Sequence, residues 1–281
     1  MITRRGRRTL RGEISWRGVG LHSGKMSAVK VMPAEAGEGI MFSFGSRRCG
    51  IREASADGTR RCTSLSFPGG ISLCTVEHLL AAIIGTGLDD IIIEPDGDEF
   101  PILDGSALPF ASDMVERGFE ESDVPRGTPS IVSCVCVEDG ASSATAVPSD
   151  ELRITYIIDY PGTAIGTELK DVVMTEESFL NEIAPARTFC LESEVKSLRE
   201  SGLARGGTLD NALIIGDDGP IGSGYRVEKE CAAHKITDLL GDMALAGFTA
   251  NAHYICVRAG HSLHSRLVRR VARGALNNSG R

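Results

Sequence analysis

Two segments of the chain follow the same layout, and this internal similarity restricts the fold more than any other feature. In each segment a histidine stands at the start of an apolar helical pattern, and a strand, a glycine-containing loop and a final amphipathic helix follow. His78 precedes Asp104 by 26 positions, and His234 precedes His261 by 27. Such a repeat predicts two copies of one strand-and-helix unit. Packed helix layer against helix layer, the two units would place both sets of polar residues at one cleft.

Hydrophobic periodicity and turn residues indicate the individual elements. Thr75 and Thr175 are the expected N-caps of two helices. The glycines between residues 18 and 25 favour a hairpin connection over a phosphate-binding loop. Strands are expected at 9–16, 28–32, 39–44, 90–94, 130–138, 151–159, 212–215 and 252–257, and helices at 75–85, 107–117, 176–184, 193–200, 234–247 and 263–273.

The predicted class is α+β with two similar domains. The prolines and glycine of residues 120–129 indicate a linker, which gives a first domain over 1–122 and a second over 128–281. Each domain carries an extra segment, at about 46–72 in the first and about 190–215 in the second.

Composition excludes several classes of protein. A net charge of −8 argues against a nucleic-acid binder, which needs clustered lysine and arginine. No apolar run is long enough for a membrane-spanning helix, so we expect a cytoplasmic protein without a membrane span. The eight cysteines form no C-x-x-C pair, which favours buried, reduced thiols.

The segment from His234 to Asp242 carries a candidate metal site. His234 and Asp238 are four residues apart and therefore share one face of a helix, which Asp242 continues by one turn. The repeat places His78 opposite His234, and two histidines with one aspartate suit a catalytic Zn²⁺ ion. The alternative is that these histidines only pack or form hydrogen bonds. Of the others, His253 is expected to pack in a strand and His264 to lie on a solvated helix face.

Further polar residues fit the chemistry of amide hydrolysis. Glu77, next to a proposed ligand, can act as the general base. His261 can donate a proton to the leaving nitrogen, and Asp242 can orient it and keep it protonated. Thr188 can donate a hydrogen bond to an oxyanion.

Dispersed motifs resemble the family of UDP-3-O-acyl-N-acetylglucosamine deacetylases, which act in lipid A biosynthesis. They occur in the family's order and extend from about residue 10 to about residue 270. The motifs are residues 18–25, 75–82, 104–107, 186–189 and 206–212, His234 with Lys235, Asp238, Gly241 with Asp242, and Gly260 with His261.

The resemblance implies helices that pack face to face between two outer sheets. It implies zinc bound by His78, His234 and Asp238, with Glu77 as general base and His261 as general acid. Thr188 would stabilise the oxyanion. The resemblance also implies substrate-binding residues, namely Lys235 for a UDP phosphate, Phe189 for the sugar or nucleotide, and Val195, Leu198, Leu203, Ala204 and Gly207 for a passage that holds the 3-O-acyl chain.

Three interpretations follow. The first is a zinc-dependent deacetylase of UDP-3-O-acyl-N-acetylglucosamine, expected to be a monomer. The second is a zinc amidase acting on another N-acyl substrate, and the third is a catalytically idle paralogue that serves as a binding module. The sequence departs from the family pattern at Ala233 and Thr237, where arginine and leucine are usual, but every proposed catalytic group is present.

Overall fold

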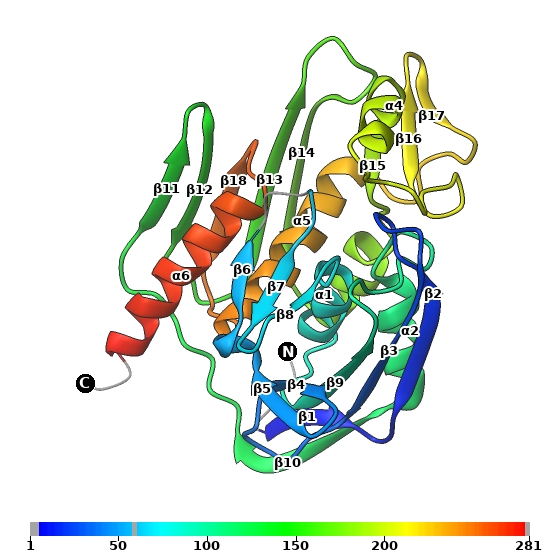
Figure 1. Ribbon diagram of the computed structural model, residues 1–281. Coiled ribbons are helices and arrows are strands. Elements are labelled where there is room, and N and C mark those ends of the chain that lie inside the picture. Colours follow the sequence, from blue (N-terminus) through cyan, green and yellow to red (C-terminus); the bar gives the residue numbers. More distant parts are fainter. Residues whose placement is uncertain (1–5, 58–60, 279–281) are drawn as a thin grey trace.

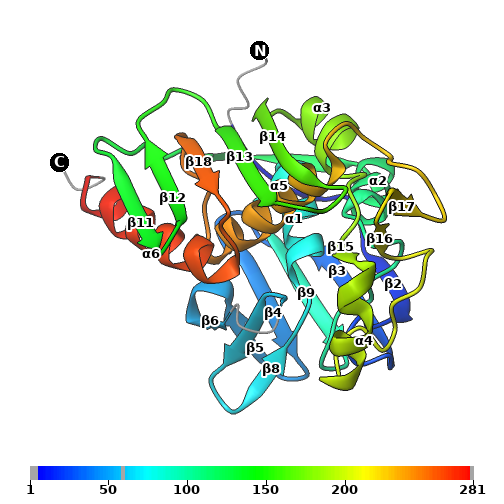
Figure 2. The same ribbon diagram turned by 90° about the horizontal axis from the view of Figure 1, so that it is seen from above.

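The computed structural model describes residues 6–57 and 61–278, and these form a layered α+β structure (Figure 1). Two five-stranded sheets form the outer layers, and helices α1 (Glu77–Gly85) and α5 (Glu230–Met243) pack against each other between them (Figure 2). Helix α2 (Leu108–Arg117) lies beside α1, and α6 (His261–Asn278) lies beside α5. The predicted α+β class with facing helix layers is therefore confirmed.

The two outer sheets have the same topology. In each sheet, the central strand comes last in the sequence and lies between two hairpins. It pairs antiparallel with one hairpin and parallel with the other. The first sheet has the order β2 (Ile14–Val19), β3 (Met26–Pro33), β9 (Ile91–Asp96), β4 (Ile40–Phe44), β5 (Arg47–Gly50). The second has the order β11 (Val135–Asp139), β12 (Ser142–Val147), β18 (His253–Val257), β13 (Arg153–Tyr160), β14 (Gly166–Val173).

This shared topology confirms the predicted repeat. In each half, a buried helix precedes the central strand and a second helix follows it, so α1, β9 and α2 correspond to α5, β18 and α6. The limits 1–122 and 128–281 stay a prediction.

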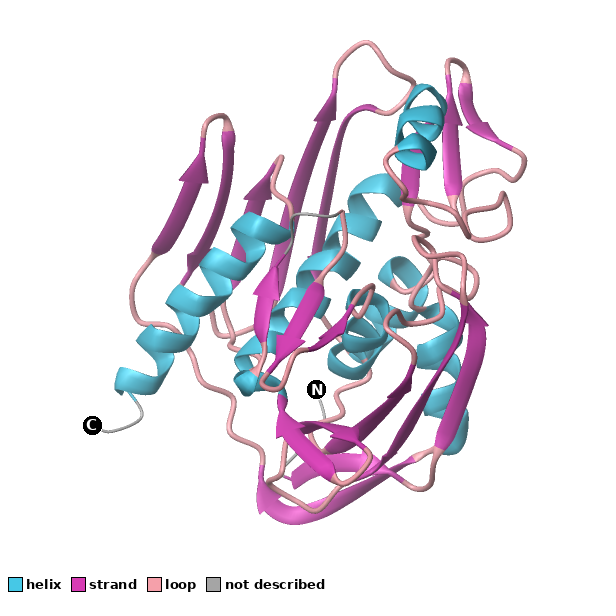
Figure 3. Ribbon diagram, in the orientation of Figure 1, coloured by secondary structure: helices cyan, strands magenta, loops and turns pink. Residues whose placement is uncertain are grey.

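Two smaller sheets occupy the extra segments (Figure 3). The first contains β6 (Ser55–Asp57), β7 (Ser64–Phe67) and β8 (Ile71–Leu73), which follow a short 3-10 helix, Ile51–Glu53. The second contains β15 (Phe189–Leu191), β16 (Leu213–Gly216) and β17 (Gly219–Ile221), with helix α4 (Glu192–Glu200) beside it. An ion pair of 2.7 Å between Arg61 and Glu194 links the two segments.

Several expected boundaries are wrong because tertiary contacts override local patterns. Residues 9–16 are not one strand. Their first part belongs to β1 (Gly6–Leu10), which pairs with β10 (Phe119–Pro125), and their last part belongs to β2. That pairing also turns part of the expected linker 120–129 into a strand. Helix α5 starts one turn before His234, and the expected helix 176–184 is α3 (Glu176–Ser178) followed by a π-helical turn, Phe179–Ile183.

The two threonine caps have different outcomes. Thr175 accepts a hydrogen bond from the main-chain nitrogen of Ser178, as a cap should. Thr75 does not cap α1, because its φ is 56° and its hydroxyl donates to Glu99 at 3.0 Å. Glu99 also accepts main-chain hydrogen bonds from His22 and Ser23, which fixes the connection between β2 and β3 as the expected hairpin.

Close packing of α1 on α5 depends on Gly241. A Cβ atom at this position would lie 2.4 Å from the carbonyl oxygen of Glu77, so a larger residue cannot be accommodated without a shift of one helix. The close approach brings the first turn of α1 against the polar face of α5. None of the helices in the described ranges is long and apolar enough to cross a bilayer.

Candidate metal centre and active site

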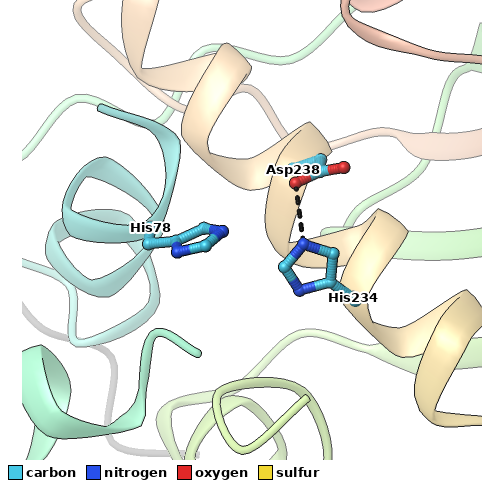
Figure 4. A group of neighbouring side chains, drawn as sticks. All are labelled: His78, His234 and Asp238. Atoms are coloured by element: carbon cyan, nitrogen blue, oxygen red, sulfur yellow. Dashed lines mark ion pairs between the residues drawn. The ribbon is translucent and has the colours of Figure 1, made fainter. Parts of the chain in front are cut away.

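Three metal-competent side chains meet where α1 packs on α5 (Figure 4). His78 extends from the first turn of α1, and His234 and Asp238 extend from successive turns of α5. Ligand atoms of the three residues lie within 4.8 Å of one another, and all three side chains are buried. The structure thus brings together the three residues that the sequence proposes as metal ligands.

The hydrogen bonds of this group fit a bound cation. His234 Nδ1 lies 3.0 Å from the carbonyl oxygen of Ala186, so that Nε2 faces Asp238 at 3.3 Å. Such a contact from the other ring nitrogen is the usual way to orient a metal-binding histidine. His78 Nδ1 is buried and has no hydrogen-bond partner among the described residues. Two imidazoles and one carboxylate are donors that suit zinc.

The charges of the three side chains also suit a metal. Burial, with help from neighbouring His234, lowers the pKa of His78 to about 3, and burial lowers the pKa of His234. Both rings are therefore neutral, the form that binds metals. Although burial opposes ionisation of Asp238, the ammonium group of Lys235 holds the pKa of this carboxyl well below its usual range.

Glu77 lies beside these ligands in a fully buried position. Burial, together with the charge of Asp238, raises the pKa of Glu77 to about 8. A group with a pKa near neutrality can both take up and release a proton during turnover. The Oε2 atom of Glu77 accepts a hydrogen bond of 3.1 Å from the main-chain nitrogen of Thr63.

His261 begins α6 and faces the same centre. Its Nδ1 lies 2.8 Å from Asp242 Oδ2, and its Nε2 lies 3.8 Å from Asp238 Oδ2. Burial alone would lower the pKa of His261, but the charges of Asp242 and Asp238 outweigh it and raise the pKa to about 9. The imidazolium form is therefore favoured at neutral pH, as a proton donor requires.

His264 was expected on a solvated helix face, and this prediction is wrong. His264 stands three and four residues before the buried Leu267 and Val268, so it shares the face of α6 that packs into the core. His264 Nδ1 lies 2.9 Å from Asp242 Oδ2, and its Nε2 lies 2.8 Å from the hydroxyl of Tyr156. His253, expected to pack in a strand, does lie in β18.

Asp242, His261 and His264 are also close enough to hold a cation. The ring Nδ1 atoms of both histidines are already hydrogen-bonded to the carboxylate of Asp242, however. The group around His78 has an unpartnered buried nitrogen instead, and its three members line the main cavity. His78, His234 and Asp238 therefore form the better candidate metal centre of these two groups.

A cavity of about 650 Å³ opens onto the candidate metal centre and continues into the second extra segment. Val195 and Leu198 of α4 and Ala204 of the following loop contribute apolar surface to its wall, beside the charged Glu192, Glu194 and Arg199 of the same helix. Of the residues proposed for substrate binding, the cavity is lined by Lys235, Phe189, Val195, Leu198, Ala204 and Gly207. Leu203, which follows Gly202 just after the end of α4, is not among the lining residues.

Thr188 lines the same cavity and is held by contacts to both halves of the chain. Its main-chain nitrogen donates to the carbonyl oxygen of Gly105 at 2.7 Å. The preceding residue, Arg187, is buried and forms an ion pair of 2.8 Å with Glu230 at the start of α5. These contacts fix Thr188 between the first half of the chain and the helix that carries His234.

Lys235 presents its ammonium group to the cavity. Nζ lies 2.8 Å from Asp238 Oδ2 and 5.6 Å from the centre of the Phe189 ring. The phosphate and sugar contacts proposed for these two residues therefore belong to one face of the cavity.

Sequence reasoning missed Thr63 and Tyr156. Thr63 stands in the polar, glycine-rich segment 46–72, where no periodic pattern marks a functional position. Tyr156 lies in a strand pattern that indicates only core packing. Their contacts with the Asp242 group depend on the packing of distant segments.

Comparisons with known proteins agree with this geometry. A family model described as UDP-3-O-acyl N-acetylglycosamine deacetylase matches residues 7–273. Proteins named UDP-3-O-acyl-N-acetylglucosamine deacetylase are similar over nearly the whole chain. The one from Thermosynechococcus vestitus is 39% identical over 94% of this chain and 93% of its own, and the one from Chlamydia trachomatis serovar D is 39% identical over 95% of each. The one from Syntrophotalea carbinolica is 37% identical over 95% of this chain and 88% of its own.

Proposed function

Because the chain belongs to the UDP-3-O-acyl N-acetylglycosamine deacetylase family, we propose that it removes the acetyl group from UDP-3-O-acyl-N-acetylglucosamine. The products would be acetate and the free amine of the sugar, in a step of lipid A biosynthesis. The observation that carries this proposal is the meeting of His78, His234 and Asp238 with a buried acid and base at one end of an apolar cavity.

The residues divide the chemistry of amide hydrolysis between them. Glu77 takes a proton from water, whose oxygen then bonds to the acetyl carbonyl carbon. The hydroxyl of Thr188 donates to the carbonyl oxygen as that oxygen gains negative charge. His261 delivers a proton to the nitrogen as the carbon–nitrogen bond breaks. Asp242 keeps the His261 ring oriented for that transfer.

The three ligands would hold one divalent ion, for which we propose zinc. Bound there, zinc would supply Lewis-acid chemistry that polarises a carbonyl and lowers the pKa of water. The chain contributes neutral imidazoles and a carboxylate that Lys235 keeps ionised.

The cavity supports the choice of substrate. Lys235 is a cation suited to a UDP phosphate, and Phe189 beside it offers an aromatic face to the sugar or nucleotide. The apolar wall formed by Val195, Leu198 and Ala204 is suited to an acyl chain. We also propose that the enzyme is cytoplasmic and monomeric.

The direct test is acetate release from UDP-3-O-acyl-N-acetylglucosamine by the zinc-loaded protein. We expect steady turnover, and the Glu77→Gln variant should be slower by about 10²–10⁴, the usual effect of losing a positioned base. Hydrolysis of simpler N-acetyl amides without hydrolysis of the UDP substrate would favour the alternative amidase. Tight binding of the UDP substrate without any turnover would favour the idle paralogue.

A further inference from the structure

We propose that Thr63 is a positioning residue that fixes the proton donor His261 and the base Glu77 relative to each other. This inference rests on the proposed deacetylase function. It assigns a role to the extra segment of the first half, whose Arg61 lines the cavity and pairs with Glu194. Thr63 lies just before β7 and is buried, with 1% of its surface exposed.

The hydroxyl of Thr63 contacts both members of the His261 and Asp242 pair. Oγ1 lies 2.5 Å from Asp242 Oδ1 and 3.0 Å from His261 Nδ1. A hydroxyl has one proton to donate, and the carboxylate can only accept. The Thr63 proton therefore goes to Asp242, and its lone pair faces the Nδ1–H of His261.

These contacts complete the hydrogen bonding of the buried Asp242 carboxylate. Oδ2 accepts hydrogen bonds from Nδ1 of His261 at 2.8 Å and from Nδ1 of His264 at 2.9 Å. Oδ1 has Thr63 as its side-chain donor. Because donors hold both oxygens, the carboxylate cannot rotate freely, and the His261 ring that it anchors keeps Nε2 directed toward the cavity.

The main chain of the same residue reaches the base. The nitrogen of Thr63 donates to Glu77 Oε2 at 3.1 Å. One residue therefore contacts the carboxylate on α1, the ring at the start of α6 and the aspartate on α5. The acid and the base come from different halves of the chain, and Thr63 links them directly.

Side-chain substitution separates these two contacts, because only the hydroxyl is lost. Thr63→Val keeps the shape and the main-chain nitrogen, whereas Thr63→Ser restores a hydroxyl. We expect Thr63→Val to lower kcat for the UDP substrate about 10- to 100-fold, as for loss of a hydrogen bond to a charged group. KM should stay within about threefold, and Thr63→Ser should recover most of the rate. If Thr63→Val folds poorly, Thr63→Ala removes the same hydroxyl with less bulk.

Thr86→Val is the matched control. Thr86 is equally buried in the first half of the chain, but its hydroxyl donates within α1, to the carbonyl oxygen of Ala82 at 2.7 Å. This variant should keep the wild-type kcat even where its melting temperature falls. If both threonine variants lose kcat in proportion to lost stability, Thr63 has only a structural role.

Two further measurements test whether the hydroxyl of Thr63 acts through His261. In a His261→Gln background, adding Thr63→Val should change the rate less than about threefold, because the hydroxyl acts through His261. If Thr63→Val lowers the rate by the same factor in the wild-type and His261→Gln backgrounds, the proposal is overturned. The ¹⁵N resonance of His261 Nδ1 should shift in Thr63→Val and return in Thr63→Ser, with unchanged zinc content. An unmoved resonance would contradict the contact.

The ring resonance can be measured without turnover, so the outcomes remain distinguishable. If wild-type protein releases no acetate, the proposed function fails, whereas the His261 signal still reports on the Thr63 contact. If wild-type protein turns over and Thr63→Val matches it, only the positioning role fails.

Discussion

At the scale of single residues, the site depends on two buried groups whose proton affinities are both raised. Burial raises the pKa of Glu77 to about 8, and Asp242 with Asp238 raises that of His261 to about 9 against the effect of burial. A base acts after losing its proton and an acid acts before losing its own. Activity should therefore rise with pH through the first titration and fall through the second.

Asp242→Asn tests the origin of the alkaline limb. Removing the carboxylate charge should lower the pKa of His261, because Asp242 is the group that raises it most. The alkaline limb of the kcat/KM profile should move to lower pH by about one unit or more, and the maximum should fall. His261→Gln should flatten this limb. If Asp242→Asn leaves the limb in place, another group titrates there.

Most of the proposed residues could be identified from sequence because they belong to local motifs. His234 and Asp238 share a helix face through spacing alone, and Glu77 with His78 starts another helix. The prediction for His264 is wrong because this polar residue occupies the same helix face as the apolar Leu267, Val268 and Val271, which are buried. Thr63 carries no local signal, since its role depends on the packing of three distant elements.

At the scale of elements, the proposed metal centre requires α1 and α5 to pack closely. Periodicity predicted both helices, but not that Gly241 would face the carbonyl oxygen of Glu77. The strand β10 was missed for a related reason. It ends at Pro125, one of the residues that indicate a linker, and its strand conformation follows from pairing with β1.

Gly241→Ala should separate the helices. The new Cβ would lie 2.4 Å from the Glu77 carbonyl oxygen, so the helices must shift, and overpacking of this kind costs about 1–3 kcal/mol. We expect a lower melting temperature and weaker zinc binding measured by competition with a chelator. Gly127→Ala is the control, because nothing lies within 4 Å of its added Cβ. Wild-type zinc affinity in Gly241→Ala would show that the packing tolerates the change.

The second extra segment should bind the acyl chain of the substrate. Gly207 lines the cavity, and a Cβ there would lie 3.3 Å from the carbonyl oxygen of Ala204 and 3.6 Å from Leu21. Gly207→Leu should therefore lower kcat/KM for long-acyl substrate about tenfold or more. A substrate without the acyl chain serves as the internal control and should be affected much less. Equal losses on both substrates would place the passage elsewhere.

At the scale of the whole molecule, the two halves repeat one topology, but their contributions to the site differ. The first half supplies His78 and Glu77, and the second supplies His234, Asp238 and His261. The sequence repeat predicted that the two sets would meet. The sequence did not reveal the cross-links between the halves, such as Thr63 with Asp242 or Arg61 with Glu194, because each partner stands alone in its local pattern.

The central claim is that one metal ion, held across the two halves by His78, His234 and Asp238, is required for deacetylation. The most direct measurement is a zinc titration of chelator-stripped protein that records bound metal and acetate release together. We expect the rate to rise with zinc until one equivalent is bound, and His78→Ala to lose both the tight site and about 10²-fold or more of the rate. Stripped protein that deacetylates at the full rate, with no response to added zinc, would contradict this account.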